Sequence, residues 1–181
     1  TTSRFEEYNY SKAKFNAEEF FWRDFCDNYL EIVKWRVYNG NKQEKESASY
    51  TLYTSLLTIL KLIAPIMPFI TEHIYQMYYK KHEKDKSIHI SKWPKYDKKL
   101  KGWVEEDTKK LLIANKWNLL IDIISKVRGI KTGNEKSMNS EIILTLDGKT
   151  YNNLKEFLQD LKNVTKAIEI KAGKEFKVGF T

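Results

Sequence analysis

Cysteine is almost absent from this sequence. Cys26 is the single cysteine among 181 residues, so the chain cannot form an internal disulfide bond. It falls within an apolar stripe, where an unpaired cysteine is most simply a small buried residue in a reducing compartment. The three histidines, His73, His82 and His89, are not spaced as metal ligands with one another or with Cys26. We therefore expect neither a disulfide framework nor a zinc site.

Long hydrophobic runs and sorting signals are missing as well. The longest apolar stretch, at about 56–70, is interrupted by Lys61, Pro65 and Pro68 and is too broken to span a bilayer. The first ten residues have neither the charged region nor the apolar region of a signal peptide. We therefore expect a cytoplasmic protein that has no membrane partner.

The motifs of common catalytic machineries are also absent. The sequence contains no glycine-rich phosphate loop and no nucleophile elbow. Adjacent glutamates occur at 18–19 and 105–106, but neighbouring carboxylates on a helix are usually solvated. We therefore predict no catalytic residue and no cofactor for this chain. The chemistry that remains is basic and aromatic, which is the chemistry of binding.

Positive charge is plentiful and unevenly distributed. The formal net charge is +8, and residues 80–101 contain nine lysines against three acidic residues, an excess of six. Such a strip favours a polyanion, such as nucleic acid, over a small acidic substrate. A lysine-rich linker that only keeps the chain soluble explains the strip equally well.

Helical periodicity dominates the first 130 residues. Apolar residues recur at intervals of three and four in four segments, at about 11–38, 45–64, 69–79 and 103–130. Ser11 is the predicted N-cap of the first helix, and Gly40 follows its end. The first two helices are expected to pack antiparallel because the loop between them is short. Several aromatic residues of the first helix are assigned to the core: Phe15, Trp22, Phe25 and Tyr29.

The remaining segments have other patterns. Residues 80–101 predict an extended strap pinned by Ile88, Ile90 and Trp93. Strands are predicted at 141–146, 164–171 and 175–180, with a helix at 151–161. The fold class is therefore mainly α, an antiparallel helical bundle followed by a small α+β unit of β-α-β-β order. The predicted domains are 1–100 and 101–181.

One stretch of the first helix resembles a known family. Residues 20–31, FFWRDFCDNYLE, together with Lys34, are similar to the segment FFW-x-DFCDWYLE-x-x-K of valyl-tRNA synthetases. Residues 62–72, 87–94 and 126–131 also resemble family segments, in the family's order. The chain departs from the family at Asn28, where tryptophan is usual, and at Gly129, where asparagine is usual.

This resemblance implies the anticodon-binding region of a class I aminoacyl-tRNA synthetase. Such a region is a helical bundle that grips the anticodon stem and loop, here of tRNA(Val). The catalytic core of these enzymes carries HIGH and KMSKS signatures and uses ATP and Mg²⁺ to attach valine. Neither signature occurs in this sequence, so we expect the core to lie upstream of residue 1.

The resemblance also suggests which residues bind RNA. We expect anticodon bases near the end of the first helix, with Trp35 stacking and with cations on phosphates or base edges at Arg23, Lys34 and Arg36. We expect the basic end of the 103–130 helix to hold the stem backbone through Lys126, Arg128 and Lys131. Trp35 can instead belong to the core, and Arg23 can instead pair with Asp24 or Asp27.

Two other functions fit the sequence. The same architecture occurs in isoleucyl-tRNA synthetase, which would change the tRNA that is bound. Alternatively, the chain is a helical protein-interaction module whose lysines are only solubilising. That module would bind no RNA at low salt, whereas phosphate contacts give binding that weakens steeply as salt rises.

Overall fold

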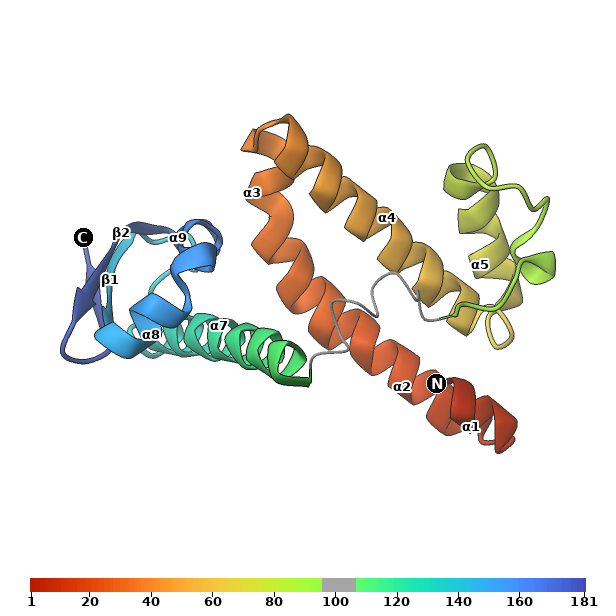
Figure 1. Ribbon diagram of the computed structural model, residues 1–181, viewed down its shortest axis with the longest axis horizontal. Helices are drawn as coiled ribbons and strands as arrows, with labels where there is room; N and C mark the ends of the chain where they lie inside the picture. Colours follow the sequence, from red (N-terminus) through yellow and green to blue (C-terminus); the bar gives the residue numbers. More distant parts are fainter. Residues whose placement is uncertain (96–106) are drawn as a thin grey trace. The chain divides into compact units, whose positions relative to one another are not determined.

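Figure 1 shows the computed structural model, which describes residues 1–95 and 107–181. The chain divides into two compact units, Thr1–Tyr96 and Asp97–Thr181. Some of the sequence-based expectations lie outside the described residues. They are the start of the long helix at Trp103, the glutamates at 105–106, and Lys98, Lys99 and Lys101.

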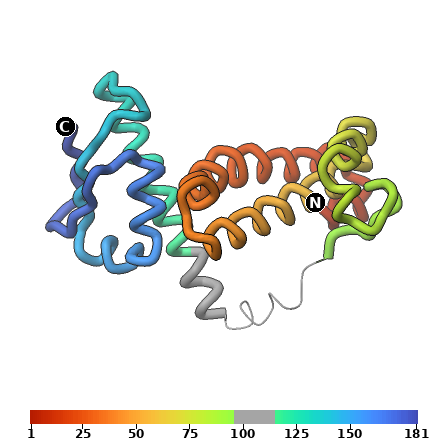
Figure 2. Tube along the Cα trace, turned by 90° about the horizontal axis from the view of Figure 1, so that it is seen from above, coloured from red at the N-terminus to blue at the C-terminus, as the bar shows by residue number. Residues whose placement is uncertain are grey.

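The first unit is built on a helical hairpin. After the short helix α1 (Thr2–Glu6), one continuous helix consists of α2 (Tyr10–Glu19), the π-helical segment η1 (Phe20–Leu30) and α3 (Glu31–Asn39). Helix α4 (Lys42–Ile63) then returns antiparallel to it (Figures 1 and 2). The two predicted helices and their antiparallel pairing are confirmed.

The ends of these helices are set by asparagine and glycine. Asn9, and not the predicted Ser11, caps α2, because its side chain accepts a hydrogen bond from the Lys12 amide at 3.1 Å. Asn41 and Glu44 form a reciprocal capping box at the start of α4. At Gly40 a Cβ atom would lie 2.5 Å from the carbonyl oxygen of Arg36, so any other residue would force this tight turn to shift.

The third helical segment packs against the end of α4. It consists of α5 (Pro68–Ile74) and the π-helical turn η2 (Tyr75–Tyr79), and it is followed by a 3₁₀ turn, η3 (Ile88–Ile90). A hydrophobic core joins them, made by Leu57, Leu60, Ala64, Tyr75, Tyr79 and Ile88. Ile88 therefore pins the segment after η2 as predicted, whereas Ile90 is 68% exposed, so its prediction as an anchor was wrong.

The buried face of the long first helix differs from the predicted one. Phe25 is buried as expected, but Phe15 and Trp22 are each 61% exposed, so their assignment to the core was wrong. Ala13 and Ala17 are buried instead. Small residues such as Ala13 and Ala17 let helices approach closely. The i→i+5 bonding of η1, which contains Trp22, shifts any stripe drawn at a period of 3.6.

The second unit has the predicted β-α-β-β order after a long helix. Helix α7 (Asp107–Gly133) is followed by β1 (Ile142–Asp147), α8 (Gly148–Asn153), the 3₁₀ turn η4 (Lys155–Phe157), α9 (Leu158–Thr165), β2 (Ala167–Gly173) and β3 (Lys177–Phe180). The sheet order is β2-β1-β3, with β1 parallel to β2 and antiparallel to β3. The fold class predicted from the sequence is confirmed.

The core of this unit lies between the sheet and its helices. Alternate residues of β1 are buried, namely Ile142, Leu144 and Leu146. Buried side chains of α7 and α9 add to them: Leu120, Ile123, Ile124, Val127 and Leu161. This alternation of buried and half-buried residues is what a strand with one covered face requires.

Candidate nucleic-acid interface

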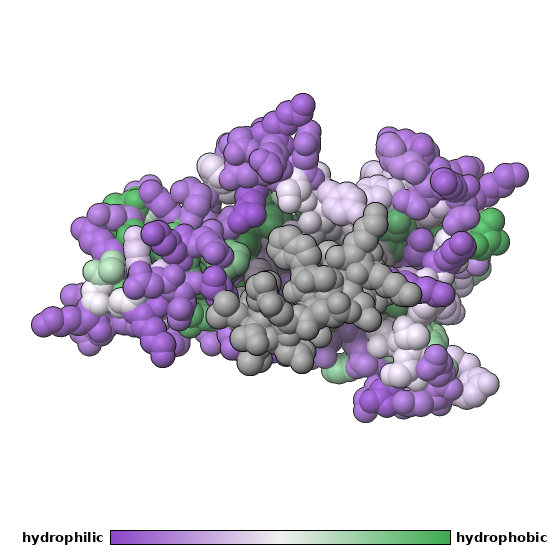
Figure 3. Space-filling view, viewed as in Figure 1, coloured by the Kyte–Doolittle hydropathy of each residue, from purple (hydrophilic) through white to green (hydrophobic). Residues whose placement is uncertain are grey.

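The most basic surface of the first unit lies on residues 80–95, which we term the lysine strap. Its six lysines are all exposed: Lys80, Lys81, Lys84, Lys86, Lys92 and Lys95. Within the described residues, the ion pairs of the structure involve none of these lysines. Figure 3 shows that many of the described side chains in this view are hydrophilic, with smaller hydrophobic areas between them. Among the described residues, the strap lysines therefore present positive charge that no carboxylate meets at ion-pair distance.

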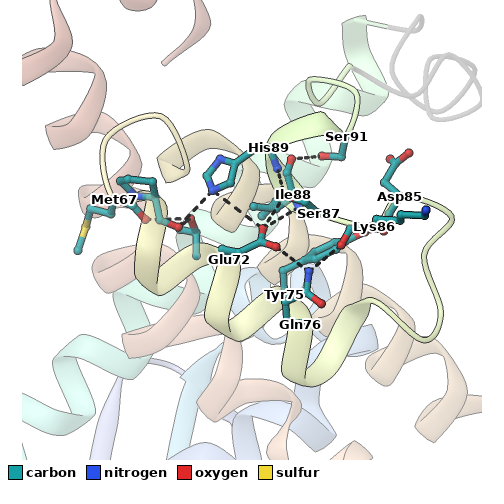
Figure 4. A network of polar contacts seen from close by, with 12 residues as sticks. Met67, Glu72, Tyr75, Gln76, Asp85, Lys86, Ser87, Ile88, His89 and Ser91 are labelled. Carbon is teal, nitrogen blue, oxygen red and sulfur yellow. Dashed lines mark hydrogen bonds and ion pairs between the residues drawn. The ribbon is translucent and has the colours of Figure 1, made fainter.

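Glu72 of α5 holds the path of the strap (Figure 4). Its Oε2 atom accepts hydrogen bonds from the Ser87 hydroxyl at 2.8 Å and from the Ile88 amide at 3.0 Å. Its Oε1 atom accepts from the Gln76 amide at 2.6 Å. Burial alone would raise the pKa of Glu72, but these hydrogen bonds and nearby His89 bring the pKa below its ordinary value.

Further hydrogen bonds tie the backbone of the strap to the helices. Gln76 also donates to the Lys86 carbonyl at 2.7 Å, and the Tyr75 hydroxyl donates to the Asp85 carbonyl at 2.9 Å. The Tyr53 hydroxyl of α4 donates to the Glu83 carboxylate at 2.8 Å, and burial together with this bond raises the pKa of Tyr53. The strap is thus fixed from both α4 and the α5–η2 helix.

The far end of the strap is anchored on α1. The Trp93 indole donates to the Thr2 hydroxyl at 3.1 Å, and its ring meets Phe5 edge to face with centroids 5.4 Å apart. Trp93 therefore pins the strap, as the sequence predicts. The family-like segments at 62–72 and 87–94 thus meet in one structural unit, through Glu72 and Ser87.

On the first helix, two of the predicted RNA-binding cations are already paired. Arg23 contacts Glu19 at 3.5 Å, which is neither of the partners expected from the sequence. Lys34 donates to both carboxylate oxygens of Glu31, at 2.7 and 2.9 Å. Both pairs are exposed, and such pairs contribute about 0–1 kcal/mol, so a phosphate can replace the carboxylate at little cost.

The two tryptophans of this helix differ in exposure. Trp35 is half-buried, as is Arg36 beside it. Trp22 is the exposed one, and its ring meets Phe21 with centroids 4.9 Å apart. Helical periodicity did not identify Trp22 as an exposed residue, because it placed Trp22 on the face predicted to be buried. Asn28, where the family usually has tryptophan, donates its side-chain amide to the Arg23 carbonyl at 2.8 Å within the π-helical segment.

In the second unit the three predicted cations have separate environments. Lys126 is exposed, with its ammonium nitrogen 5.9 Å from the centroid of the Phe176 ring, and Arg128 is half-buried. Lys131 is 1% exposed, which corrects its assignment to the RNA surface. Its ammonium group donates to the carbonyls of Met138, Ser140 and Thr165 at 2.9, 2.7 and 2.8 Å.

Lys131 therefore stabilises the fold of the second unit. The three N–H donors of an ammonium group match its three carbonyl acceptors. Burial, together with the positive charge of Lys166, lowers the pKa of Lys131. An exposed cation can exchange partners with a phosphate, whereas this one would have to leave the interior.

Two kinds of feature are absent from the part of the chain that the structure describes. Within residues 1–95 and 107–181, no group of three or more histidine, cysteine, aspartate or glutamate residues is placed to hold a metal ion. A search of the same residues finds no helix with the length and hydropathy of a membrane span. The fold is a helical bundle followed by a small α+β unit, and its described surface carries exposed cations and exposed aromatic rings, which are groups that proteins use to bind phosphates and unpaired bases.

Comparison with known proteins identifies the family. Residues 1–146 match the family described as the anticodon-binding domain of tRNA ligase, and the chain belongs to this family. It is 37% identical over 175 residues to a valine–tRNA ligase of Orientia tsutsugamushi and 38% identical over 174 residues to one of Rickettsia prowazekii. A valine–tRNA ligase of Anaplasma marginale is 34% identical over 172 residues.

These matches cover nearly all of this chain but a small part of the relatives. They include 93% of this chain for the first two proteins and 94% for the third. The chain spans 20%, 20% and 19% of the lengths of the three ligases. The resemblance to valyl-tRNA synthetases drawn from the sequence is confirmed.

Proposed function

We propose that this chain binds the anticodon stem and loop of a tRNA, and that the tRNA is that of valine. The observation that carries the proposal is the agreement between the family and the relatives. The anticodon-binding family covers residues 1–146, and the three ligases compared above are all named for valine. The exposed lysines of the strap and the exposed Trp22 support it, because RNA binding uses phosphate contacts and ring stacking.

The proposal extends to the protein in which such a segment works. We propose that it acts with a catalytic core that precedes residue 1 and that attaches valine to tRNA, with ATP and Mg²⁺ bound by that core. The site of this activity is the cytoplasm. The described residues supply the binding of tRNA, and the reacting groups belong to the core.

Six of the seven cations and rings predicted from the sequence stay in the proposal. Arg23 and Lys34 are exposed and would exchange their carboxylate partners for phosphates, and Trp35 and Arg36 follow Lys34 on the helix. Lys126 and Arg128 would hold the backbone of the stem. Lys131 is left out because its ammonium group is occupied in the interior.

A filter-binding titration tests the proposal. The full chain is titrated with valine tRNA, isoleucine tRNA and an unrelated tRNA at several salt concentrations between about 50 and 200 mM, where phosphate contacts give a steep dependence. We expect the tightest binding for valine tRNA and a loss of affinity as salt rises. Equal affinity for all three contradicts valine specificity, and a preference for isoleucine tRNA favours the isoleucyl alternative. An absence of binding at low salt favours a protein-interaction module.

A further inference from the structure

We propose that the lysine strap is a phosphate-binding surface for the backbone of the bound tRNA, and that Glu72 positions it. This inference rests on the proposed function and adds a surface to it. The RNA-binding residues suggested by the family resemblance lie on the long helix and on α7. The strap is a separate segment, and its hydrogen bonds join it to α4, α5, η2 and α1.

The distribution of charge in the first unit favours the strap as the surface that binds phosphate. Residues 1–79 contain nine basic and ten acidic residues, so this part of the unit has no positive excess. Residues 80–95 contain six lysines against Glu83 and Asp85. The positive excess of the described part of the unit therefore comes from the strap. A phosphate backbone is drawn to such a concentration of charge.

The ion pairs of the first unit also favour the strap as the phosphate-binding surface. On the long helix, Lys14, Arg23 and Lys34 each have a glutamate partner within 3.5 Å. The strap lysines have no carboxylate within ion-pair distance among the described residues. Glu83, one of the two acids of the strap, receives a hydrogen bond from Tyr53. A phosphate would thus meet lysines that need not first leave a partner.

The fixed path of the strap favours its interpretation as a binding surface over its interpretation as a solubilising linker. Four consecutive residues, 85–88, are each held by a hydrogen bond from or to the α5–η2 helix. Ordering a segment costs about 1–2 kcal/mol per residue, and a linker needs no such order. A surface that is ordered before binding avoids this cost when the partner arrives.

Glu72 is a positioning residue in this proposal. Its carboxylate accepts bonds from Gln76, Ser87 and the Ile88 amide, so it faces the strap backbone. It has no role as a phosphate ligand, because a carboxylate repels phosphate. Its effect on RNA binding must therefore pass through the strap lysines that precede the residues it holds, Lys84 and Lys86 above all.

The first experiment removes charge from the strap. A triple variant, Lys81→Gln, Lys84→Gln and Lys86→Gln, is compared with a control that loses the same charge from the helices, Lys12→Gln, Lys42→Gln and Lys45→Gln. All six lysines are exposed. Valine tRNA is titrated against both full-length variants and the parent chain. We expect the strap variant to lose at least tenfold in affinity and about two to three units of salt slope, at about 0.9 units per lost phosphate contact.

The control is expected to change affinity by less than threefold. Equal losses in the two triple variants overturn the proposal, because a general charge effect then explains them. If the parent chain binds no tRNA, the proposed function fails together with this inference. If the parent binds and the strap variant behaves as the parent does, the inference alone fails.

The second experiment tests Glu72 without touching a lysine. We expect Glu72→Gln to increase amide hydrogen exchange at 84–91 and to weaken tRNA binding about threefold to tenfold. In the strap triple variant the same substitution should have no further effect on affinity, since Glu72 acts through those lysines. Ser87→Ala, which removes one bond, is a milder variant if Glu72→Gln folds poorly. Faster exchange with unchanged affinity in both variants overturns the positioning role.

Discussion

Glu72 in the first unit and Lys131 in the second hold irregular segments in similar ways but with opposite charges. The Glu72 carboxylate accepts bonds from a side-chain amide, a hydroxyl and a backbone amide. The Lys131 ammonium donates to three backbone carbonyls. Each joins its own helix to residues that lie outside that helix. The comparison shows that a charged residue next to a loop can be an internal anchor.

The comparison also separates two kinds of lysine. Lys131 looks from the sequence like part of a basic helix end, and the strap lysines look like a linker. In the structure Lys131 is buried, whereas the strap lysines are exposed on a segment that Glu72 fixes. The number of charges in a segment therefore does not say which of them can reach a phosphate.

Breaking the Lys131 anchor should have the largest effect on stability. Lys131→Met keeps much of the volume but leaves three carbonyls without a donor, so we expect a loss of about 3 kcal/mol in the free energy of unfolding. Hydrogen exchange of the β1 amides in urea measures this loss of stability. Lys126→Met, at an exposed position of the same helix, should cost less than about 0.5 kcal/mol. Equal costs for the two variants would contradict the anchor.

Breaking the Glu72 anchor should cost less and should depend on pH. Glu72→Gln should lower the free energy of unfolding by about 2 kcal/mol at neutral pH, as expected for bonds to a charged group. Because the folded pKa of Glu72 is lowered, its contribution is fully present above the ordinary pKa of 4.5 and is lost as the pH falls through the folded value.

Urea unfolding of the parent chain and of Glu72→Gln between neutral and acidic pH checks this dependence. The difference between the two proteins should shrink below the ordinary carboxyl pKa. Glu46→Gln, on the exposed surface of α4, is the control and should show a small difference at every pH. A difference that stays constant with pH would argue against a charged anchor.

Much of the fold could be predicted from the sequence, whereas little of the site could be. Strong periodicity marks the helices of the hairpin and the β-α-β-β order of the second unit. The faces that those elements bury depend on distant partners, so Ala13 and Ala17 were missed and Trp22 was placed in the core. The bonds of Glu72 join residues up to sixteen positions apart, and no local pattern shows them.

Closing the space at Gly40 should disturb the hairpin of the first unit. Gly40→Ala would place a Cβ atom 2.5 Å from the Arg36 carbonyl oxygen, and the turn must shift to relieve this overlap. We expect a loss of about 1–2 kcal/mol in the free energy of unfolding, within the range for overpacking. Thermal unfolding followed by circular dichroism is the measurement. An unchanged midpoint would show that the turn tolerates a side chain.

The smallest effect is expected at Gly129 in the second unit, and it has the opposite sign. A Cβ atom there meets nothing within 4 Å, and the residue lies within helix α7. Gly129→Ala should therefore stabilise the helix by about 0.5–1 kcal/mol. A rise in the thermal midpoint supports this expectation. A fall would mean that the helix needs glycine at this position.

The most direct test of the central proposal compares two RNAs that differ in the anticodon alone. The 181-residue chain is titrated with valine tRNA and with the same tRNA carrying a different anticodon. We predict that the changed anticodon weakens binding at least tenfold while the salt slope stays the same, because the phosphates remain in place. Equal affinity for the two RNAs would contradict anticodon recognition by this chain.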